Sequence, residues 1–318
     1  MALFNQSYTN IGSQFGMPLF GVGGVLPFTG NYFWVDAANG SDGNTGGPQD
    51  PFATLKQAHS SCLSGNNDVV FLTGTVHTTA TLTWSKNMTH LIGLTAPSNS
   101  DRARISATGA TAFSPLVNVT GYGCKFINIG TFHGGFTGAT GSQVCWNEGA
   151  SGGGRNYYNN CQFYGGGDAT TAALSGMRSL TITASDENVF ENCTIGLDTI
   201  VRATNANASM EVLGGSARTR MKGCVFQALV SDASDVHITA GVGAMDRYLL
   251  LDGCALINVV DSTSTTMTVA ITNSASASII LNGCISLGAT AIASTGPVYI
   301  NQISAAGATT TGIAIKAT

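Results

Sequence analysis

Cysteine recurs along the middle of this chain at a nearly constant interval, each time directly after glycine or asparagine. Counted along the sequence, the spacings are 161−124 = 37, 193−161 = 32, 224−193 = 31, 254−224 = 30 and 284−254 = 30. A period of about 30 residues is typical of one structural unit stacked on copies of itself. We therefore expect a solenoid, and the cysteines concerned are Cys124, Cys161, Cys193, Cys224, Cys254 and Cys284.

The residues around each cysteine alternate as they do in strands. Three positions before the last five cysteines come Tyr158, Phe190, Met221, Leu251 and Leu281. Two positions after the six cysteines come Phe126, Phe163, Ile195, Phe226, Leu256 and Ser286. Such spacings put side chains on one face of a strand, whereas glycine and asparagine readily adopt the left-handed backbone of a sharp bend. Each unit is predicted to be a strand, a one-residue bend, a strand and a longer loop, although Gly121 breaks the pattern in the first copy.

Stacking these units would give one elongated all-β domain. Strands about 4.8 Å apart would hydrogen-bond along the stack and bury a ladder of like side chains. Over residues 110–300 the chain resembles the pectate-lyase-like superfamily of right-handed parallel β-helices. We therefore predict a right-handed single-stranded parallel β-helix over residues 76–318, with the six cysteines in an inward core ladder.

Residues 1–31 are predicted to form an extended arm, because they are apolar but rich in glycine and proline. Such a segment forms no regular helix and is a liability when exposed to water. Two interpretations stay open: the segment packs on its own domain, or it is a docking arm that becomes ordered on a partner or a neighbouring subunit. In the docking interpretation the anchoring residues are Phe4, Phe15, Met17, Leu19, Phe20, Val22, Val25, Leu26 and Phe28.

Residues 32–75 are predicted to cap the N-terminal end of the stack. A strand leads into a polar loop at 36–47, and Asp50 then caps a helix that begins at Pro51. This order resembles the opening of many pectate-lyase-like β-helices, where it is a structural cap over the open end. The inner face of the predicted helix carries Phe52, Leu55, Ala58 and Cys62.

Composition narrows the classes of function. Charged residues make up 9% of the chain, against about 25% in an average globular protein, which favours a surface covered by other subunits. The net charge of −4 offers no basic surface for nucleic acid, and no apolar run approaches the roughly 20 residues that cross a bilayer. The N-terminal sequence has no secretory signal, so we expect folding in the cytoplasm with reduced thiols. The sequence contains no C-x-x-C pair of the kind that binds zinc, and we predict neither a metal nor a cofactor.

The acidic residues give only scattered candidates for chemistry. Asp168, Asp198, Asp232 and Asp261 stand at offsets of 7, 5, 8 and 7 from the nearest preceding ladder cysteine and form one loose column of carboxylates. Glycosidases need two carboxylates placed across a groove, but these four fall in loops of variable length. No catalytic residue is therefore predicted, and an acidic glycan-cleaving site at these aspartates is the alternative.

Three further features each have two interpretations. The polar loop at 36–44 either binds calcium or stabilises turns, and its spacing favours turns. The basic segment at 218–222 either pairs with acidic residues of neighbouring rungs or binds an acidic glycan. The tryptophans either pack within the protein or stack on sugars, and they are Trp34, Trp84 and Trp146.

A chain with this repeat, little charge, an apolar arm and no secretory signal resembles bacteriophage virion proteins of the β-helix fold. The resemblance implies a non-catalytic virion structural protein, commonly a homotrimer. A head-decoration or cement protein anchored by residues 1–31 ranks first, since the chain is short for a fibre and has no coiled-coil heptads. The expected partners are the major capsid protein or other virion proteins. The alternative is a tail fibre or tailspike that binds or cleaves a host-surface polysaccharide.

Overall fold

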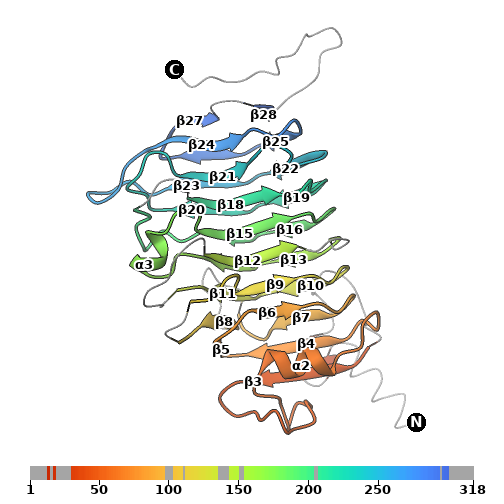
Figure 1. The fold of residues 1–318 in the computed structure, drawn as a ribbon. Helices are drawn as coiled ribbons and strands as arrows, with labels where there is room; N and C mark the ends of the chain where they lie inside the picture. The colour runs from red at the N-terminus through yellow and green to blue at the C-terminus, as the bar shows by residue number, and fades with distance from the viewer. Residues whose placement is uncertain are drawn as a thin grey trace.

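The computed structural model describes residues 13–14, 17–18, 30–96, 103–109, 112–134, 143–149, 154–203, 207–293 and 296–300. Within these residues the chain winds into a stack of three-stranded turns, which is a parallel β-helix (Figure 1). This confirms the all-β solenoid that the cysteine period predicts. The period of about 30 residues arises because each turn lays one strand on each of three sheets.

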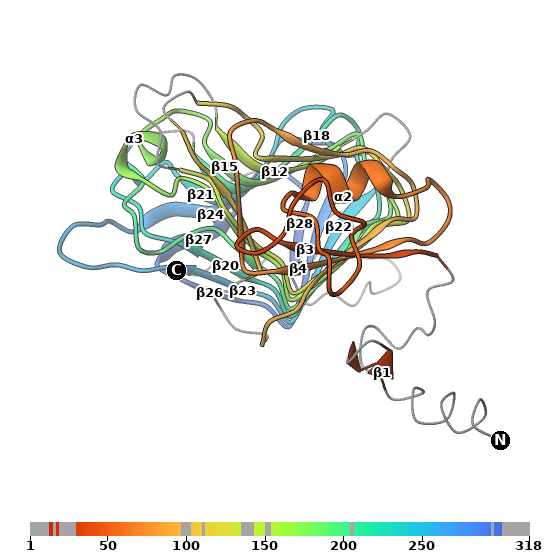
Figure 2. The ribbon, with the colours of Figure 1, turned by 90° about the horizontal axis from the view of Figure 1, so that it is seen from below.

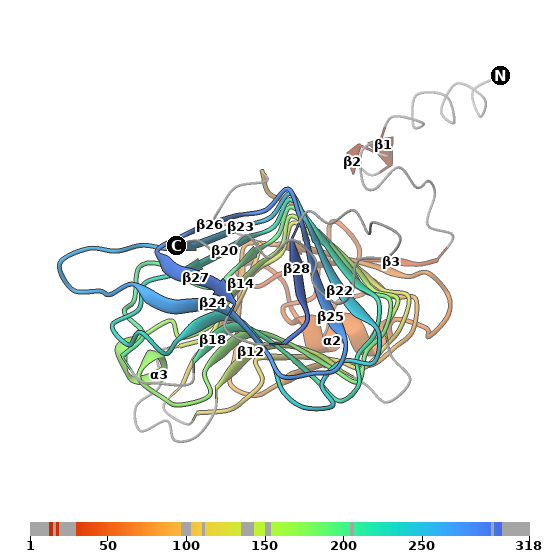
Figure 3. The same cartoon turned by 90° about the horizontal axis from the view of Figure 1, so that it is seen from above.

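The three sheets are parallel and enclose the interior, as the view along the axis shows (Figure 3). The first sheet contains β3 (Tyr32–Asp36), β4 (Val69–Thr73), β7 (His90–Gly93), β10 (Lys125–Ile127), β13 (Tyr157–Asn159), β16 (Val189–Glu191), β19 (Thr219–Lys222), β22 (Tyr248–Asp252), β25 (Ser278–Asn282) and β28 (Val298–Ile300). The second contains β5 (Thr75–Thr78), β8 (Arg104–Ala107), β11 (Gly130–Phe132), β14 (Gln162–Tyr164), β17 (Thr194–Ile195), β20 (Val225–Ala228), β23 (Ala255–Asn258) and β26 (Ile285–Leu287). The third contains β6 (Leu82–Trp84), β9 (Val117–Val119), β12 (Val144–Gly149), β15 (Arg178–Thr183), β18 (Ala208–Leu213), β21 (Val236–Ala240), β24 (Met267–Asn273) and β27 (Ala289–Ala293).

A left-handed residue makes the sharp bend between the first and second sheets, which is the apex in Figure 3. Asn160 and Asn192 have φ values of 49° and 53°, and Gly253 has 60°. These are the residue types that adopt this region at least cost, so the predicted one-residue bend is present. From β10 onward the column is Asn128, Asn160, Asn192, Gly223, Gly253 and Gly283, and Gly74 makes the bend between β4 and β5.

The residues that follow these bends form the inward column at the apex. From Cys161 to Cys254, each cysteine carbonyl accepts a hydrogen bond from the amide after the cysteine of the next turn. Cys124 does not lie in this column, which corrects the sequence prediction. It precedes β10 and aligns with Asn156, whereas Ile129 occupies the ladder position of that turn. The first spacing is therefore 161−129 = 32 instead of 37, and the column is Ile129, Cys161, Cys193, Cys224, Cys254 and Cys284.

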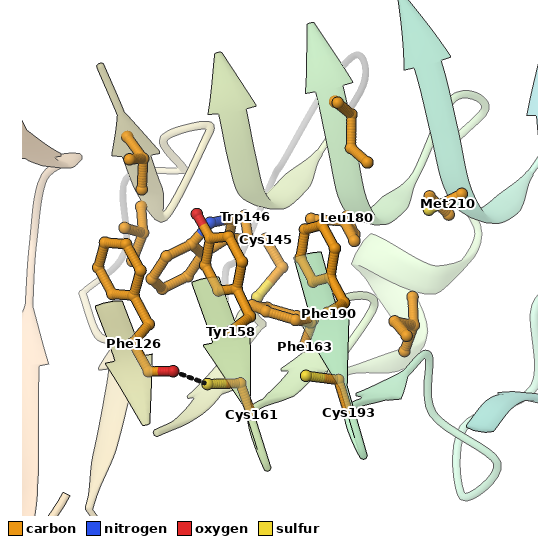
Figure 4. Close-up of a cluster of buried hydrophobic side chains, with 14 of the residues drawn as sticks. Phe126, Cys145, Trp146, Tyr158, Cys161, Phe163, Leu180, Phe190, Cys193 and Met210 are labelled. Atoms are coloured by element: carbon orange, nitrogen blue, oxygen red, sulfur yellow. Dashed lines mark hydrogen bonds between the residues drawn. The ribbon is translucent and has the colours of Figure 1, made fainter. Parts of the chain in front are cut away.

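Aromatic side chains fill the middle of the helix (Figure 4). Phe126, Tyr158 and Phe190 stack on successive strands of the first sheet, with ring centroids 4.9 Å and 4.4 Å apart. Trp146 of β12 meets Phe126 and Tyr158 edge-on, at centroid distances of 5.1 Å and 5.8 Å. Both geometries are favourable for aromatic pairs. This core fixes the inner face of the third sheet and therefore decides which of its residues face outward.

Helix α2 (Leu55–Ser61) covers the N-terminal end of the stack (Figure 2). It begins later than the sequence predicts, because Thr54 is the N-cap and accepts a hydrogen bond from Gln57 N. Asp50 instead accepts hydrogen bonds from Thr45 within the preceding loop. The predicted inner face is buried, and it consists of Phe52, Leu55, Ala58 and Cys62.

Most of the predicted arm lies outside the described residues. Its two described pieces, β1 (Ser13–Gln14) and β2 (Met17–Pro18), pair antiparallel. Met17 belongs to β2, but nothing described bears on its predicted anchoring role. The boundaries at 31 and 75 and the docking role of the arm therefore stay predictions. The anchoring residues outside the described ones are Phe4, Phe15, Leu19, Phe20, Val22, Val25, Leu26 and Phe28.

Candidate functional site

The third sheet carries a column of polar side chains on its outer face. Trp146 and Glu148 are buried in the interior, so Asn147 between them faces outward. The same alternation holds on the neighbouring strand β15, where Leu180 and Ile182 are buried. Register partners on seven successive strands make up this polar column, and they are Thr83, Asn118, Asn147, Thr181, Glu211, Thr239 and Thr272.

Hydrogen bonds join the polar column along the axis of the helix. Asn147 Nδ2 donates to Asn118 Oδ1 at 2.8 Å. Asn147 Oδ1 accepts from Thr181 Oγ1 at 2.7 Å and from Thr183 Oγ1 at 2.9 Å. An amide nitrogen has two donor positions and a hydroxyl oxygen has two acceptor positions. Thr181 is only 4% exposed, so the hydrogen-bonding capacity that the polar column keeps for a ligand lies mainly with Asn147 and with the neighbouring Thr183, both half-buried.

An open groove with a volume of about 420 Å³ lies over the polar column. Its lining comes from four successive turns, so it is about 14 Å long at the usual strand spacing. The volume falls in the range of ligand sites. The lining residues are Pro115, Val144, Asn147, Gly176, Arg178, Thr181, Thr183, Glu211 and Leu213.

An ion pair crosses the floor of this groove. Arg178 Nε lies 2.9 Å from Glu211 Oε2, and Arg178 Nη1 donates to the carbonyl of Met177 at 2.8 Å. The Arg178 side chain is 9% exposed and that of Glu211 is 25% exposed. Glu211 is the one carboxylate among the nine lining residues, so the described lining does not contain the carboxylate pair of glycosidases.

Glu148 faces the interior directly behind the polar column. Asn156 Nδ2 and Ser185 Oγ donate to Glu148 Oε1 at 2.9 Å and 2.8 Å, and the Tyr158 hydroxyl donates to Oε2. Burial raises the pKa of Glu148 to about 7, although the three hydrogen bonds act in the opposite direction. Because the side chain is enclosed, Glu148 acts on stability rather than on a ligand in the groove.

A second buried polar cluster lies between the second and third sheets. Arg202 Nη2 donates to Ser209 Oγ at 2.7 Å, and Asp235 Oδ1 accepts from Asn207 N at 3.0 Å. Burial raises the pKa of Asp235 to about 7, against the attraction of Arg202, and lowers the pKa of His237 to about 3. These groups are enclosed and do not line the groove.

The predicted column of aspartates belongs to loop turns. Asp168 caps the short helix α3 (Ala169–Ala172). Asp168, Asp232 and Asp261 each accept a hydrogen bond from the backbone amide two positions ahead, at 2.9, 2.8 and 2.7 Å. These bonds lower the pKa of Asp232 and Asp261. Asp198, the fourth predicted aspartate, also lies in a loop between the second and third sheets, as the other three do. None of the four lines the groove.

The other candidate residues have mainly structural roles. Trp84 and Trp146 are buried, and Trp34 packs against Phe71 with ring centroids 5.0 Å apart. In the basic segment, Arg218 forms an exposed pair with Glu187 at 2.9 Å, as the cross-rung interpretation predicts.

In the polar loop, the Asp36 carboxylate accepts hydrogen bonds from Ala38 N and from the side chain of Asn39, both at 2.9 Å. These bonds favour the turn interpretation of this loop. Among the described residues no group of three or more metal-ligating side chains comes together. Within the same residues no helix is long and apolar enough to cross a membrane.

Sequence reasoning missed the polar column because its spacing is irregular. Counted from the ladder cysteine of the same turn, Thr181 stands at 181−161 = 20, Glu211 at 211−193 = 18 and Thr239 at 239−224 = 15. The loop between the second and third sheets varies in length from turn to turn, so residues of the polar column have no constant spacing from the ladder cysteine. Alternation of polar and buried positions within each strand of the third sheet was the only signal present.

Neither a family model nor a curated protein sequence matches the chain. A rhamnogalacturonan lyase has a similar structure, with a TM-score of 0.53 and 12% identity over 81% of this chain and 68% of that one. Tailspike protein 2 of Escherichia coli O157:H7 bacteriophage CAB120 has a TM-score of 0.41 and 11% identity over 81% of this chain and 41% of its own. Pectin methylesterase from Aspergillus niger has a TM-score of 0.44 and 14% identity over 89% and 92%. At these identities the likeness shows the fold alone, which is a parallel β-helix.

The prediction that the protein is not an enzyme is contradicted by the comparisons, because the rhamnogalacturonan lyase of similar fold is an enzyme. Other solved structures to which the chain is similar include a pectin methylesterase, an alginate lyase and a pectate lyase. The carboxylates that were candidates from the sequence lie in loops of variable length. Glu211 was not among them, and it lies in the groove on the third sheet.

Proposed function

We propose that the protein holds a polysaccharide chain in the groove over the polar column. The observation that carries this proposal is the hydrogen-bonded row of Asn118, Asn147 and Thr181. The last two of these residues line the groove beside the Arg178–Glu211 pair. This role corresponds to the tail fibre or tailspike hypothesis rather than to head decoration.

A glycan fits this groove because both are rich in groups that donate and accept hydrogen bonds. Asn147 and Thr181 are register partners on adjacent strands, about 4.8 Å apart along the helix axis, and Thr183 lies beside Thr181 on the same strand. A polymer that lies along the axis meets several of these groups in turn. Val144 and Leu213 add apolar surface for the faces of sugar rings.

Glu211 is the group in this lining that is suited to move a proton. A cleavage reaction in the groove would use it as the acid–base group, because the other described lining residues include no second carboxylate and no histidine. The experiments below therefore measure release of cleavage products as well as binding.

We also propose a virion location, in which residues 1–31 attach the β-helix to a capsid or tail protein as part of a homotrimer. The low charge and the apolar, glycine-rich sequence of the arm support this proposal. Deleting residues 1–30 is expected to leave a folded β-helix that no longer attaches to particles. Attachment of the truncated protein would contradict the role of the arm.

The proposed binding is tested with the full chain and a panel of soluble polysaccharides, using calorimetry and an assay for new chain ends. Replacing Thr181 and Thr183 with valine keeps the shape and removes two hydroxyls from the groove. We expect affinity to fall about fivefold to thirtyfold, since the variant loses one or two hydrogen bonds that each contribute about 1 kcal/mol.

The matched control is the double variant Thr239→Val, Thr272→Val. These threonines belong to the same polar column and bond to each other at 3.0 Å, but they do not line the groove. The control should bind as the wild type does. Equal affinities of the two double variants, or no binding of any polysaccharide in the panel, would overturn the proposed function.

A further inference from the structure

We propose that the groove selects a neutral, hydroxyl-rich polysaccharide and discriminates against polyuronates, with Glu211 as the residue that sets this specificity. The inference rests on the proposed function and names the substrate class of the same groove. Its basis is the distribution of charge among the lining residues and the hydrogen bonds that Arg178, the one cation among them, makes to the protein.

Arg178 and Glu211 are the two charged residues among the nine that line the groove. Arg178 donates from Nε to Glu211 and from Nη1 to the carbonyl of Met177. Its side chain is almost fully covered, whereas a quarter of the Glu211 side chain is exposed. The charge that a ligand meets in the groove is therefore the carboxylate of Glu211.

Within the described part of the chain, Arg178 is the one residue that hydrogen-bonds to the Glu211 carboxylate, and it does so through Oε2. Oε1 is thus available to accept a hydrogen bond from a sugar hydroxyl. A hydrogen bond to an ionised carboxylate is stronger than one between neutral groups. A neutral sugar gains this interaction without bringing a charge of its own into the groove.

A uronate residue would bring its carboxylate next to Glu211. The described lining offers no second cation to neutralise that charge, and Arg178 already donates from Nε and Nη1 to groups of the protein. Like charges brought together in a partly dry groove repel each other, and such repulsion is an effective source of specificity. The rest of the lining is neutral, and its amide and hydroxyl groups suit hydroxyls.

The test compares polymers that differ in the uronate group and share the sugar configuration, such as galactan with polygalacturonate and mannan with polymannuronate. Calorimetry with the full chain measures the dissociation constant for each polymer. We expect the neutral member of the bound pair to bind at least tenfold more tightly. In Glu211→Gln, the affinity for the polyuronate should rise about tenfold, while that for the neutral polymer should fall about threefold because its hydrogen bond to a charged acceptor is lost.

A second variant keeps the test informative, because Glu211→Gln leaves Arg178 without its partner. The double variant Arg178→Met, Glu211→Gln removes both charges, and it should bind the two members of a pair with similar affinity. Tighter binding of the polyuronate by the wild type, or unchanged discrimination in both variants, would overturn the inference and leave the proposed function standing. Failure of every polymer to bind would overturn both.

Discussion

Arg178 Nε and Glu211 Oε2 lie 2.9 Å apart on adjacent strands of the third sheet, with the guanidinium group almost covered. Replacing Arg178 with methionine should destabilise the fold, because Glu211 would keep its charge without a partner. We expect a loss of about 2 kcal/mol in the free energy of unfolding, which is less than for a wholly buried pair since Glu211 is partly solvated. Urea denaturation measures this difference.

The control for this prediction is Arg155→Met. Arg155 pairs with Glu187 at 2.8 Å, but the Arg155 side chain is largely exposed. Exposed pairs contribute little because water screens them. The control should therefore unfold at the urea concentration of the wild type. A loss of stability as large as that of Arg178→Met would show that burial does not distinguish the two pairs.

The thiols give a second prediction, which concerns their accessibility. Seven of the eight cysteines are buried and Cys284 is half-buried, and all eight are free thiols. Burial also raises the pKa of Cys145 to about 12, which suppresses the reactive thiolate. A thiol reagent such as Ellman's reagent should react quickly with no more than one thiol in the native chain and with all eight after unfolding.

The Cys284→Ser variant identifies the thiol that reacts. We expect the fast phase to disappear in this variant while the total after unfolding falls by one. Rapid reaction of several thiols in the native protein would contradict the buried ladder at the apex.

Much of the fold was predictable from the sequence because local chemistry repeats in every turn. Glycine or asparagine before the ladder residue fixes the bend, and the stack of Tyr158 and Phe190 fixes the first sheet. The assignment of Cys124 to the ladder failed because a left-handed glycine, Gly123, also precedes this cysteine. Cys124 follows a different bend but has the same local sequence as the ladder cysteines. Only the pairing of strands shows that Ile129 takes its place.

The groove was not predictable for a different physical reason. Its residues come from strands that follow loops of unequal length, so Asn147, Thr181 and Glu211 share no common spacing from the ladder. Their contact is created by register along the stack, which depends on the packing of the whole turn. A site formed by side chains from different turns therefore cannot be predicted from the period of the cysteine column alone.

The bend at the apex gives a third prediction. Gly253 has φ of 60°, and a Cβ added there would meet no atom within 4 Å. Gly253→Ala should therefore cost about 1–2 kcal/mol of stability through backbone conformation alone. Gly253→Asn should lose less, because asparagine occupies this position in the turns of Asn160 and Asn192.

The matched control for the bend is Gly241→Ala. A Cβ at Gly241 also meets no atom within 4 Å, but the backbone there is not left-handed. This variant should be neutral or slightly stabilising. Thermal or urea denaturation that gave equal losses for the two alanine variants would contradict the role of the left-handed bend.

Glu148 gives a pH prediction whose sign follows from its burial. Burial raises the pKa of Glu148 from its ordinary value of 4.5 to about 7 in the folded protein. Below pH 4.5 the carboxyl is neutral in both states and there is no penalty for burying it. As the pH rises from 4.5 to about 7, the unfolded chain ionises first, so stability falls. The loss above that pH is on the order of 3 kcal/mol, since each unit of pKa corresponds to about 1.4 kcal/mol.

Glu148→Gln tests this prediction by removing the titration while keeping an acceptor for Asn156 and Ser185. Urea denaturation at pH 5 and pH 8 should show a smaller loss of stability with rising pH in the variant than in the wild type. Asp235 titrates in the same direction, because burial raises its pKa to about 7, so part of the pH dependence should persist in Glu148→Gln. Adding Asp235→Asn should remove most of that remainder. A wild-type-like pH dependence in Glu148→Gln would show that Glu148 is ionised in the folded interior, where its three hydrogen bonds would then outweigh the cost of burial.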